Sequence, residues 1–399
     1  MAPQEPGEGL RPHPLIADCN PSSGGSAATF SLREKDNGAH PMTSTSPSRR
    51  SLLAASATAL VAAPHVARAQ GAIRWRMITS WTKNLPGPGI SAERLAQRIN
   101  AMSGGRMAVE VFPAGAIVPA FGVFEAVSTG VSEMGHTASF FWDGKMPGAA
   151  LFTTAPFGLP PTEHQTWIER RGGQQLWDEF YRPHGVRGLL AGNTGPSMGG
   201  WFRKPIANVD DIKGLRIRVQ GLGGEVYREM GATPQSIPPG DIITALERGT
   251  IDAAELLAPM NDQPQGFHRF APVYHMPGFN KPNGSAEALI SLSAFEKLPN
   301  DLREIVEHAC AAEHIAGLIE AQASNAQAIT ELAAAGARVM PFPADVIAAM
   351  RAKTQIVLDR KAGESAFAAR IIASYRTAIS AGRNWAAIEA YMAQVTRQS

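Results

Sequence analysis

The sequence predicts an α/β fold with two lobes. Its 399 residues are 44% hydrophobic and 18% charged, which is typical of a globular chain with a core large enough for two lobes. Short segments typical of strands alternate with helical segments, and this alternation occurs in two groups. Such alternation favours parallel sheets that are covered by helices. After Leu298 the pattern changes to long helices.

The first group of segments covers residues 70–195 and predicts most of the first lobe. The stretch "AIRWRMITSW", which begins at Ala72, is typical of a strand, and "NLPGPG" interrupts it. Apolar residues then recur at helical spacing between positions 90 and 102. Further strands are expected at "RMAVEVFP" from Arg106 and at "VRGLLAGN" from Val186.

The second group covers residues 196–292 and predicts most of the second lobe. Strands are expected at "GLRIRVQG", from Gly214, and at "TIDAAELL", from Thr250. Between them "PPGDIITALERG" predicts a helix that Asp241 caps and Gly249 ends.

The last segment of the chain is expected to be mainly helical. Residues 293–335 contain a long alanine-rich helix that begins at Asn300, and residues 336–399 form a strand followed by three helical segments. The last of these segments has an apolar stripe, made of Trp385, Ile388, Met392 and Val395. The stripe predicts either packing on the chain's own lobe or contact with a second subunit.

The first 70 residues differ from the rest. Residues 1–41 are rich in Pro, Gly, Ser and charge, which predicts either a disordered extension or a gene start placed too early, with Met42 as the natural start. Residues 42–69 have the order of an export signal: the basic pair Arg49 and Arg50, a short apolar stretch and a small-residue cleavage motif. The letters "SRRSLL" resemble the twin-arginine kind of signal. We therefore expect export to the periplasm.

The charge of the chain excludes one class of partner. The chain has 37 basic and 35 acidic residues, a formal net charge of +2, and no long basic run. This balance lacks the electrostatic footprint of a nucleic-acid-binding protein, so we expect no nucleic acid partner.

One short motif suggests an enzyme. The letters "GPSMG", residues 195–199, fit the nucleophile elbow of serine hydrolases with Ser197 as nucleophile, and Asp252 and His268 follow in the required order. The elbow requires a helix directly after it, whereas "GWFRKPIANV" is not typical of a helix. A secreted serine hydrolase is therefore kept only as the alternative to a binding protein.

A helical set of four residues offers metal-binding side chains. Glu304 and His308 form one i, i+4 pair, and Cys310 and His314 form another. At about 100° per residue the two pairs lie roughly 240° apart around the helix. They do not converge on one ion, and a polar helix surface explains them better.

Two arginines and a glutamate indicate a different kind of site. Strand alternation places Arg216 and Arg218 on one side of "GLRIRVQG", where either can hold a carboxylate with its forked guanidinium, unless both are solvated. Glu255 lies in an apolar run near the end of a predicted strand, where α/β sheets bind their ligands. Glu255 and an anionic ligand would repel each other unless a metal ion or a lysine lay between them.

Four long stretches carry a resemblance to a known family: "GNTGPSMGGWFRKPI", "IKGLRIRV", "GGEVYREMGATPQSIPPGDIITALERGTIDAAE" and "YHMPGFNKP". From about Arg74 to its C-terminus the chain resembles the solute receptors of tripartite ATP-independent periplasmic (TRAP) transporters, above all the branch that binds 2-oxo acids such as pyruvate. The resemblance implies two α/β lobes hinged around a ligand cleft, with a long helix across both. It also implies C-terminal helices that pair two subunits, and a membrane permease that receives the ligand.

The resemblance also assigns residues to the site. It makes Arg218 the clamp for the ligand carboxylate and leaves Arg216 without a ligand contact. Glu255 and the backbone carbonyl of Leu256 help to hold a cation, sodium or calcium, that also contacts the acid. A backbone carbonyl does not depend on its side chain, so Leu256 is compatible with that role.

Several positions depart from the 2-oxo acid branch of the family. Ser197 replaces a glutamine that contacts the ligand or the metal, which implies a larger pocket there. Phe279 replaces a tryptophan, and Asn280 and Lys281 replace polar or acidic residues of the cleft lining. We hypothesise that the Lys281 ammonium lies near Glu255 and takes over some or all of the metal's role, the alternative being that it points into solvent.

Aromatic residues near the predicted strand ends are candidates for the apolar wall of the cleft: Trp81, Phe141, Trp142 and Trp201. Any one of them can instead belong to the core. As a whole, the sequence predicts a non-enzymatic periplasmic receptor for a small carboxylic acid. A receptor that reports its ligand to a signalling protein would have the same site.

Overall fold

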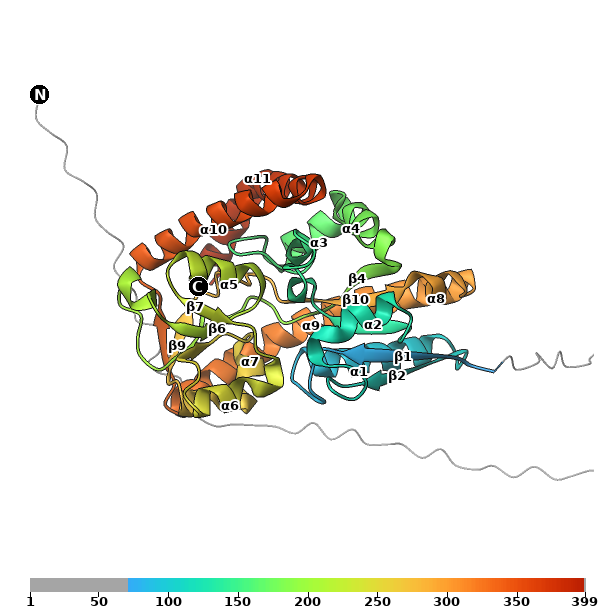
Figure 1. Ribbon diagram of the computed structural model, residues 1–399, viewed down its shortest axis with the longest axis horizontal. Coiled ribbons are helices and arrows are strands. Elements are labelled where there is room, and N and C mark those ends of the chain that lie inside the picture. The colour runs from blue at the N-terminus through green and yellow to red at the C-terminus, as the bar shows by residue number, and fades with distance from the viewer. Residues whose placement is uncertain (1–70, 398–399) are drawn as a thin grey trace, which may run out of the picture. The chain divides into compact units, whose positions relative to one another are not determined.

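The computed structural model describes residues 71–397, so the predictions for residues 1–41 and 42–69 lie outside the described residues. Over residues 71–397, helices cover a pair of β-sheets, and each sheet is the centre of one lobe (Figure 1). The two-lobed α/β fold is therefore confirmed. In the same range no helix is long and apolar enough to cross a membrane.

The first lobe contains a five-stranded sheet in the order β2-β1-β3-β10-β4. Its strands are β1 (Ile73–Thr79), β2 (Met107–Phe112), β3 (Met134–Thr137), β4 (Val186–Asn193) and β10 (Ser285–Ser291). β1 runs parallel to β2 and β3, whereas β10 runs antiparallel to β3 and β4. The prediction of a parallel sheet is wrong for β10. This strand reaches the first sheet from the second lobe and therefore runs in the opposite direction.

The second lobe contains a six-stranded sheet in the order β11-β9-β5-β8-β6-β7. Its strands are short: β5 (Gly200–Phe202), β6 (Arg216–Arg218), β7 (Thr233–Gln235), β8 (Ala253–Ala254), β9 (Val273–Met276) and β11 (Arg338–Pro341). β6 is parallel to β7 and β8, and β5 is antiparallel to β8 and β9, so the prediction of a parallel sheet is wrong for β5. The strand predicted at "TIDAAELL" is reduced to two residues, because its pairing with β5 and β6 covers no more than these.

α-Helices cover both sheets. Within the described residues they are α1 (Pro88–Met102), α2 (Val123–Ser128), α3 (Pro161–Arg170), α4 (Gly173–Tyr181), α5 (Gly221–Glu229), α6 (Ile242–Glu247), α7 (Pro259–Asp262), α8 (Leu292–Glu296), α9 (Asn300–Ala334), α10 (Ala344–Glu364) and α11 (Ala366–Thr396). α9 packs against β4 and α1 in the first lobe and against α7 in the second (Figure 1). The predicted long helix across both lobes is thus confirmed, including its start.

The chain crosses between the lobes more often than the predicted boundaries imply. The range 196–292 predicted for the second lobe includes β10, yet β10 lies between β3 and β4 in the first sheet. β11 comes from the predicted C-terminal range and adds an edge strand to the second sheet beside β9. Each sheet is therefore completed by a strand from outside its main range.

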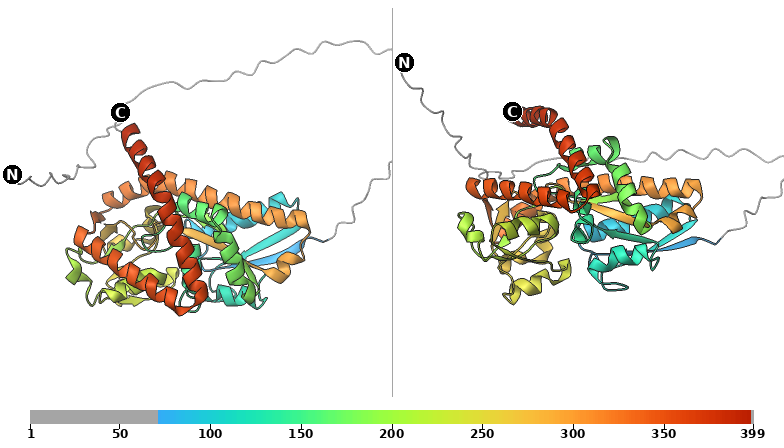
Figure 2. Two further views of the ribbon diagram at one scale, coloured as in Figure 1. Left: turned by 90° about the horizontal axis from the view of Figure 1, so that it is seen from above. Right: turned by 45° about the horizontal axis from the view of Figure 1, so that its top comes forward.

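Between residue 344 and the last described residue, 397, the chain forms two long helices, where the sequence predicted three segments. The break lies at Ser365, whose backbone is extended and whose side chain accepts a hydrogen bond from the Ala368 N–H. α10 packs on α5, and α11 packs on α3 and α4. Gly382 does not interrupt α11, and the C-terminal end of this helix stands away from the lobes (Figure 2).

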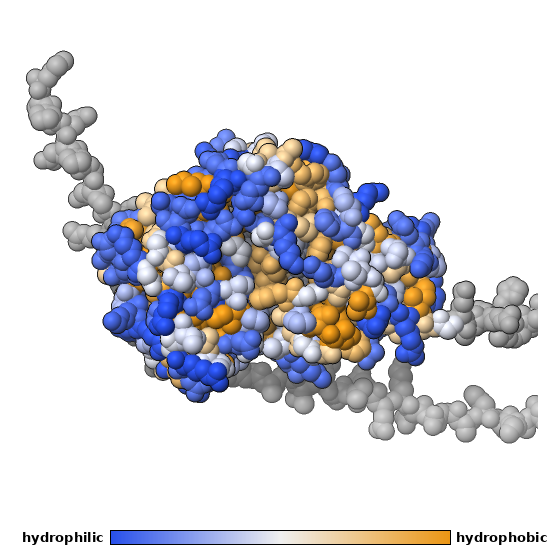
Figure 3. All heavy atoms as spheres, viewed as in Figure 1, coloured by the Kyte–Doolittle hydropathy of each residue, from blue (hydrophilic) through white to orange (hydrophobic). Residues whose placement is uncertain are grey.

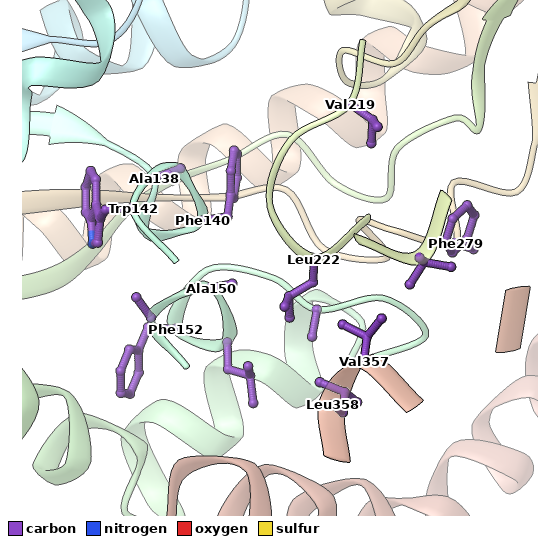
Figure 4. Packing of buried hydrophobic residues seen from close by; sticks show 14 of the residues in the cluster. Ala138, Phe140, Trp142, Ala150, Phe152, Val219, Leu222, Phe279, Val357 and Leu358 are labelled. Atoms are coloured by element: carbon purple, nitrogen blue, oxygen red, sulfur yellow. The ribbon is translucent and has the colours of Figure 1, made fainter. Parts of the chain in front are cut away.

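One apolar cluster connects the two lobes with α10. Figure 4 shows some of its members: Phe140 from the first lobe, Leu222 and Phe279 from the second, and Val357 and Leu358 from α10. Burial of one such side chain contributes about 1.5–3 kcal/mol to stability, so the cluster holds α10 against both lobes. On the outside, Figure 3 shows mostly hydrophilic residues with smaller hydrophobic groups between them on the face that is viewed.

The helix predicted in "PPGDIITALERG" forms, but its predicted cap does not. Asp241 stands at the position before α6, yet its side chain accepts no hydrogen bond from the helix. Ile242 and Leu246 are fully buried, and Gly249, with a φ of +70°, follows the helix as predicted. Burial of its apolar face, rather than a side-chain cap, therefore positions α6.

Two buried histidines are held in the neutral form. Nδ1 of His314, on α9, donates to the Gly192 carbonyl at 2.9 Å, and Nε2 of His164, on α3, donates to the Leu151 carbonyl at 3.0 Å. Burial lowers the pKa of each imidazole from 6.5 to about 4. The folded chain therefore keeps both rings neutral at neutral pH.

We expect the folded chain to lose stability as the pH falls from about 7.5 to about 5.5. An unfolded histidine gains a proton below pH 6.5, whereas His164 and His314 in the folded chain do so only near pH 4. Their neutral state therefore carries no penalty above pH 6.5, and stability declines as the pH falls below it. Each ring should account for about 1.4 kcal/mol of loss at the lower pH. Denaturant unfolding at both pH values measures this loss.

The matched pair of variants is His314→Gln and His308→Gln. His308 lies on the same helix with an exposed side chain. The stability difference between the two pH values should shrink in His314→Gln and stay at the wild-type value in His308→Gln. An undiminished difference in His314→Gln would contradict the role given to this ring.

Candidate functional site

The predicted site residues lie at the carboxyl ends of two neighbouring parallel strands. Arg218 is the last residue of β6, and Glu255 directly follows β8. The two strands pair with Arg218 opposite Ala254, and the Glu255 N–H donates to the Arg218 carbonyl at 2.9 Å. Strand pairing therefore fixes the two charged residues side by side, at the edge where α/β sheets bind ligands.

Arg218 is buried, and its guanidinium is only partly used. Nε donates to the Ile237 carbonyl at 2.9 Å, while Nη1 donates to the Glu255 carbonyl and lies 3.8 Å from Oε2 of the same residue. Burial lowers the pKa of Arg218 to about 10, so the side chain stays charged at neutral pH. Among residues 71–397 its Nη2 donates no hydrogen bond, which leaves two N–H groups for a further acceptor.

Arg216 does not join this arrangement. Its side chain is 45% exposed, and its Nη2 lies 2.6 Å from Oδ1 of Asp252. The two arginines thus share one side of β6 but lie at different depths. The hypothesis of two solvated arginines is wrong for Arg218, because the Ile237 segment covers the end of the strand.

Lys281 provides the second cation of the site. Its Nζ donates to the Leu256 carbonyl at 2.5 Å and lies 2.5 Å from Oε1 of Glu255, which is the distance of an ion pair without the angles of a hydrogen bond. The ring centre of Phe140, from the first lobe, is 5.3 Å away. Burial lowers the pKa of Lys281, and Glu255 acts against this shift. Because Lys281 is only 5% exposed, the alternative that it points into solvent is wrong.

The loop that carries Lys281 is fixed against the segment before β5. The Ser197 N–H donates to the Lys281 carbonyl at 3.0 Å, and the Ser197 carbonyl accepts from the Gly278 N–H at 3.0 Å. A Cβ at Gly278 would overlap the Ser197 carbonyl, so this close approach requires glycine. The backbone of "PGFNKP" therefore places the lysine before its side chain makes any contact.

Several buried polar atoms near these charges have no hydrogen-bond partner among the described residues. They are Ser197 Oγ, Tyr227 Oη, both carboxylate oxygens of Glu255 and both amide atoms of Asn280. Leaving a buried polar group without a partner costs about 1–3 kcal/mol. A ligand with carboxylate and carbonyl oxygens would accept hydrogen bonds from Ser197, Tyr227 and Asn280.

A further carboxylate supports the segment that follows Glu255. Asp262 is buried and accepts hydrogen bonds from Trp201 Nε1 at 2.9 Å, from the Tyr274 hydroxyl at 2.8 Å and from the Leu257 N–H at 3.1 Å. Burial raises its pKa to about 6. Because three protein donors satisfy this carboxylate, its role is to position the backbone next to Glu255.

The first lobe touches the second around this site. Phe140 lies over Lys281, and Gly221, with a φ of +58°, leaves room for it where a Cβ would come within 2.9 Å of the Phe140 Cβ. Nearby, Nδ2 of Asn261 donates to the Pro86 carbonyl at 2.8 Å. Charges between the lobes are therefore shielded from water, which strengthens their interactions.

The four predicted aromatic residues have different surroundings. The rings of Trp81 and Phe141 contact each other with centres 5.7 Å apart, and both stay predictions for the apolar wall. Trp142 instead donates to the Tyr181 hydroxyl at 2.9 Å within the core of the first lobe. Trp201 has no exposed surface and packs in the core of the second lobe. For the last two, the core alternative holds.

Sequence patterns miss three residues of this arrangement: Phe140, Tyr227 and Asp262. Tyr227 lies in "GGEVYREM", one of the stretches that carry the family resemblance, so a signal for it exists. No such signal exists for Phe140, because this residue reaches Lys281 only across the contact between the lobes. Asp262 becomes a buried anion only when Trp201 on β5 and the tyrosine on β9 pack against it.

The predicted donor set for a metal ion is already occupied by the protein. The sequence predicts Glu255, the Leu256 carbonyl and Ser197 as ligands of sodium or calcium. Lys281 Nζ contacts the first two oxygens at 2.5 Å, which lies within the roughly 2.3–2.6 Å of calcium–oxygen bonds. An ion on both oxygens would have to share them with the ammonium and would be repelled by its charge, so this arrangement does not favour one. Across residues 71–397 no three His, Cys, Asp or Glu side chains group to hold a metal.

The alternative hydrolase site does not assemble in the described residues. The Ser197 hydroxyl has no hydrogen-bond partner there, so no base activates it. Asp252 pairs with Arg216 instead of orienting His268.

The four metal-type residues on α9 lie on different faces of the helix. The side chains of Glu304 and His308 are exposed, whereas Cys310 and His314 are buried. As predicted, the two pairs do not converge. The expectation of a polar surface is wrong for the second pair, because α9 packs that face on the first lobe, where His314 bonds to Gly192.

Comparison with known proteins identifies relatives along most of the chain. The family model for bacterial extracellular solute-binding proteins, family 7 (DctP), matches residues 82–364. A monocarboxylate 2-oxoacid-binding periplasmic protein from Nostoc sp. is 37% identical over 294 residues, which cover 74% of this chain and 80% of that protein.

Solved structures of similar proteins share the fold. A TRAP transporter solute-binding protein from Bordetella bronchiseptica is 34% identical, with a TM-score of 0.79 over 82% of this chain and 99% of that one. That protein is described as a mixed-occupancy dimer, with calcium and picolinate in one active site and an apo second site. A relative from Pseudoalteromonas atlantica, with bound sodium and pyruvate, is 34% identical. Its TM-score is 0.78, and the match covers 80% of this chain and 98% of that one. A relative from Colwellia psychrerythraea, with bound calcium and pyruvate, is 32% identical. Its TM-score is 0.78, and the match covers 81% of this chain and 99% of that one.

These similarities agree with the architecture of the chain. The family match covers more than two thirds of its length and includes the ends of β6 and β8, the lysine loop and α9. The solved relatives match both lobes at high coverage. The chain belongs to family 7 of the bacterial extracellular solute-binding proteins, the DctP family.

Proposed function

We propose that the chain is a receptor that binds a small monocarboxylate of the 2-oxo acid class and delivers it to a TRAP membrane permease. Membership of the family supports the receptor class. The Nostoc relative is named for 2-oxo acids, and two of the similar structures contain pyruvate. These acids share a carboxylate next to a carbonyl group, and the site has matching donors.

The observation that carries this proposal is a pair of buried cations, Arg218 and Lys281, on either side of a single carboxylate, Glu255. Buried charges are costly unless they are paired, and here two cations share one anion. The negative charge of Asp262 also acts on both cations, but its oxygens accept from neutral donors and make no direct contact with either cation. A ligand carboxylate at the unused Nη2 of Arg218 would supply the missing acceptor through a charge-assisted contact.

The unpartnered polar atoms suit the rest of such a ligand. Ser197 Oγ, Tyr227 Oη and Asn280 Nδ2 can each donate to the 2-oxo oxygen or to the second carboxylate oxygen. Trp81 and Phe141 would form the apolar wall beside the ligand's side chain. A short hydroxyl at residue 197 would leave more room there than a glutamine, which favours acids larger than pyruvate as natural ligands.

Ligand binding and lobe closure are coupled in this proposal. Phe140 covers Lys281 from the first lobe, and the hydrogen bond between Asn261 and Pro86 joins the lobes beside the site. Opening the lobes would admit water to the charges and weaken their hold on the acid. A closed receptor therefore retains its ligand until the permease separates the lobes.

We place the receptor in the periplasm, without an enzymatic step. The family is extracellular, and residues 42–69 have the composition of an export signal. The chemistry of the site supports binding rather than turnover, because the Ser197 hydroxyl lacks a base among the described residues. A sensor that binds the same acid would differ only in its membrane partner.

We also propose that α11 pairs two copies of the chain. Large apolar side chains near its end are 46% to 69% exposed: Trp385, Ile388, Tyr391, Met392 and Val395. A continuous exposed apolar face on one helix is typical of an interaction surface. This end of α11 stands away from the lobes, and the Bordetella relative is described as a dimer (Figure 2).

Arg218→Ala should abolish binding of the acid. The change removes the two unused N–H groups of the Arg218 guanidinium and leaves Glu255 less compensated. We expect the affinity for pyruvate to fall more than 100-fold, about 3 kcal/mol or more. Isothermal titration calorimetry measures the change.

Arg216→Ala is the matched control for that experiment. Arg216 lies on the same strand, but its guanidinium pairs with Asp252 at the surface. Its loss should change the affinity less than threefold. Retained affinity in Arg218→Ala, with both variants folded, would refute the assignment of the clamp.

The double variant Trp385→Ser with Tyr391→Ser should be monomeric where the wild type is dimeric. The substitutions remove the two largest exposed side chains of the proposed contact. Light scattering after size-exclusion chromatography measures the molar mass of the wild type and of the double variant. Ile319→Ser is the control, because Ile319 is equally exposed but lies on α9. A monomeric wild type, or a double variant that stays dimeric, would disprove the α11 contact.

A further inference from the structure

Similar structures hold sodium or calcium with their acid ligand, whereas this chain brings a lysine to its site. The family resemblance assigns the metal to Glu255 and the Leu256 carbonyl. Lys281 Nζ contacts both of these oxygens, each at 2.5 Å. The ammonium therefore makes the two protein contacts that are expected of the metal.

The position of the ammonium is determined by the fold. On the backbone side, the Lys281 carbonyl accepts from the Ser197 N–H, and the Lys281 N–H donates to the Gly278 carbonyl at 3.2 Å. At the ammonium end, the face of the Phe140 ring lies 5.3 Å away, which stabilises a cation. If this side chain left the site, Oε1 of Glu255 would lose its ion-pair partner, and Arg218, 3.8 Å from Oε2, would be the remaining cation.

An ammonium can also make the third contact of such an ion, the contact to the ligand. It has three N–H groups, of which one donates to the Leu256 carbonyl and one faces Glu255. The remaining N–H is available to a ligand oxygen. A lysine carries its single positive charge as a compact point, which suits a place between two carboxylates.

We propose that Lys281 is a tethered cation that replaces the metal ion of this site, so that the chain binds its monocarboxylate without sodium or calcium. The inference rests on the proposed function, since it concerns how the same acid is held. A tethered cation does not dissociate. The affinity for the acid is then independent of free metal ions, whereas a site that binds acid and metal together gains affinity as the metal concentration rises.

The first test compares wild-type protein with and without metal. Pyruvate, as the probe, is titrated into protein dialysed against a chelator in potassium salt, and then into the same protein with added calcium or sodium at constant ionic strength. We expect dissociation constants that agree within about twofold. An affinity at least tenfold higher with either ion would overturn the proposal.

The second test uses Lys281→Met, which keeps the length of the side chain and removes its charge. In chelator, its affinity for pyruvate should fall at least 30-fold, with Lys204→Met, at an exposed lysine, as the control. Wild-type affinity in Lys281→Met would overturn the proposal. If this variant does not fold, the comparison of the wild type with and without metal decides the question by itself.

The two proposals fail in different ways. If pyruvate and larger 2-oxo acids bind only when calcium or sodium is present, the receptor proposal stands and the tethered cation is refuted. If none of these acids binds with or without metal, the receptor proposal itself fails, and the inference about Lys281 fails with it.

Discussion

One buried carboxylate, shared by two cations, is the interaction on which the site depends. Glu255 lies between Arg218, at the end of β6, and Lys281, on the loop before β10. Without that carboxylate two like charges would be buried next to each other, which is strongly unfavourable. Without both cations the carboxylate would itself be an unpaired buried charge. The three residues are therefore stable in this place only as a set, and each restricts what can replace the others.

The surrounding structure keeps this set dry and ordered. Parallel pairing of β6 with β8 brings Arg218 next to Glu255, and the glycine of "PGFNKP" lets the lysine loop lie against Ser197. Asp262 uses its hydrogen bonds to hold the backbone that follows Glu255. Phe140 adds a cover from the other lobe. Since electrostatic interactions strengthen as water is excluded, the contact between the lobes and the charges of the site reinforce each other.

A lysine and a metal ion solve the same electrostatic problem in different ways. Both keep a protein carboxylate and a ligand carboxylate from repelling each other. A metal ion coordinates several oxygens and can be lost, whereas the Lys281 ammonium has three directed N–H groups and is bound covalently to the chain. The lysine brings one positive charge to the site, whereas a calcium ion would bring two. A site built this way suits one carboxylate of the ligand and makes a second one unfavourable.

The sequence by itself determined the fold class, the long helix α9, and the positions of Arg218 and Glu255 at strand ends. These features follow from local periodicity, from the family stretches and from the rule that α/β sheets bind ligands at strand ends. Only the tertiary structure decided the direction of β10, the two-residue length of β8, the depth that separates Arg218 from Arg216, and the contact of Lys281 with Glu255 and Phe140. These features depend on which distant segments pack together. A side chain's burial and its charged partner are set by those long-range contacts, which no local pattern encodes.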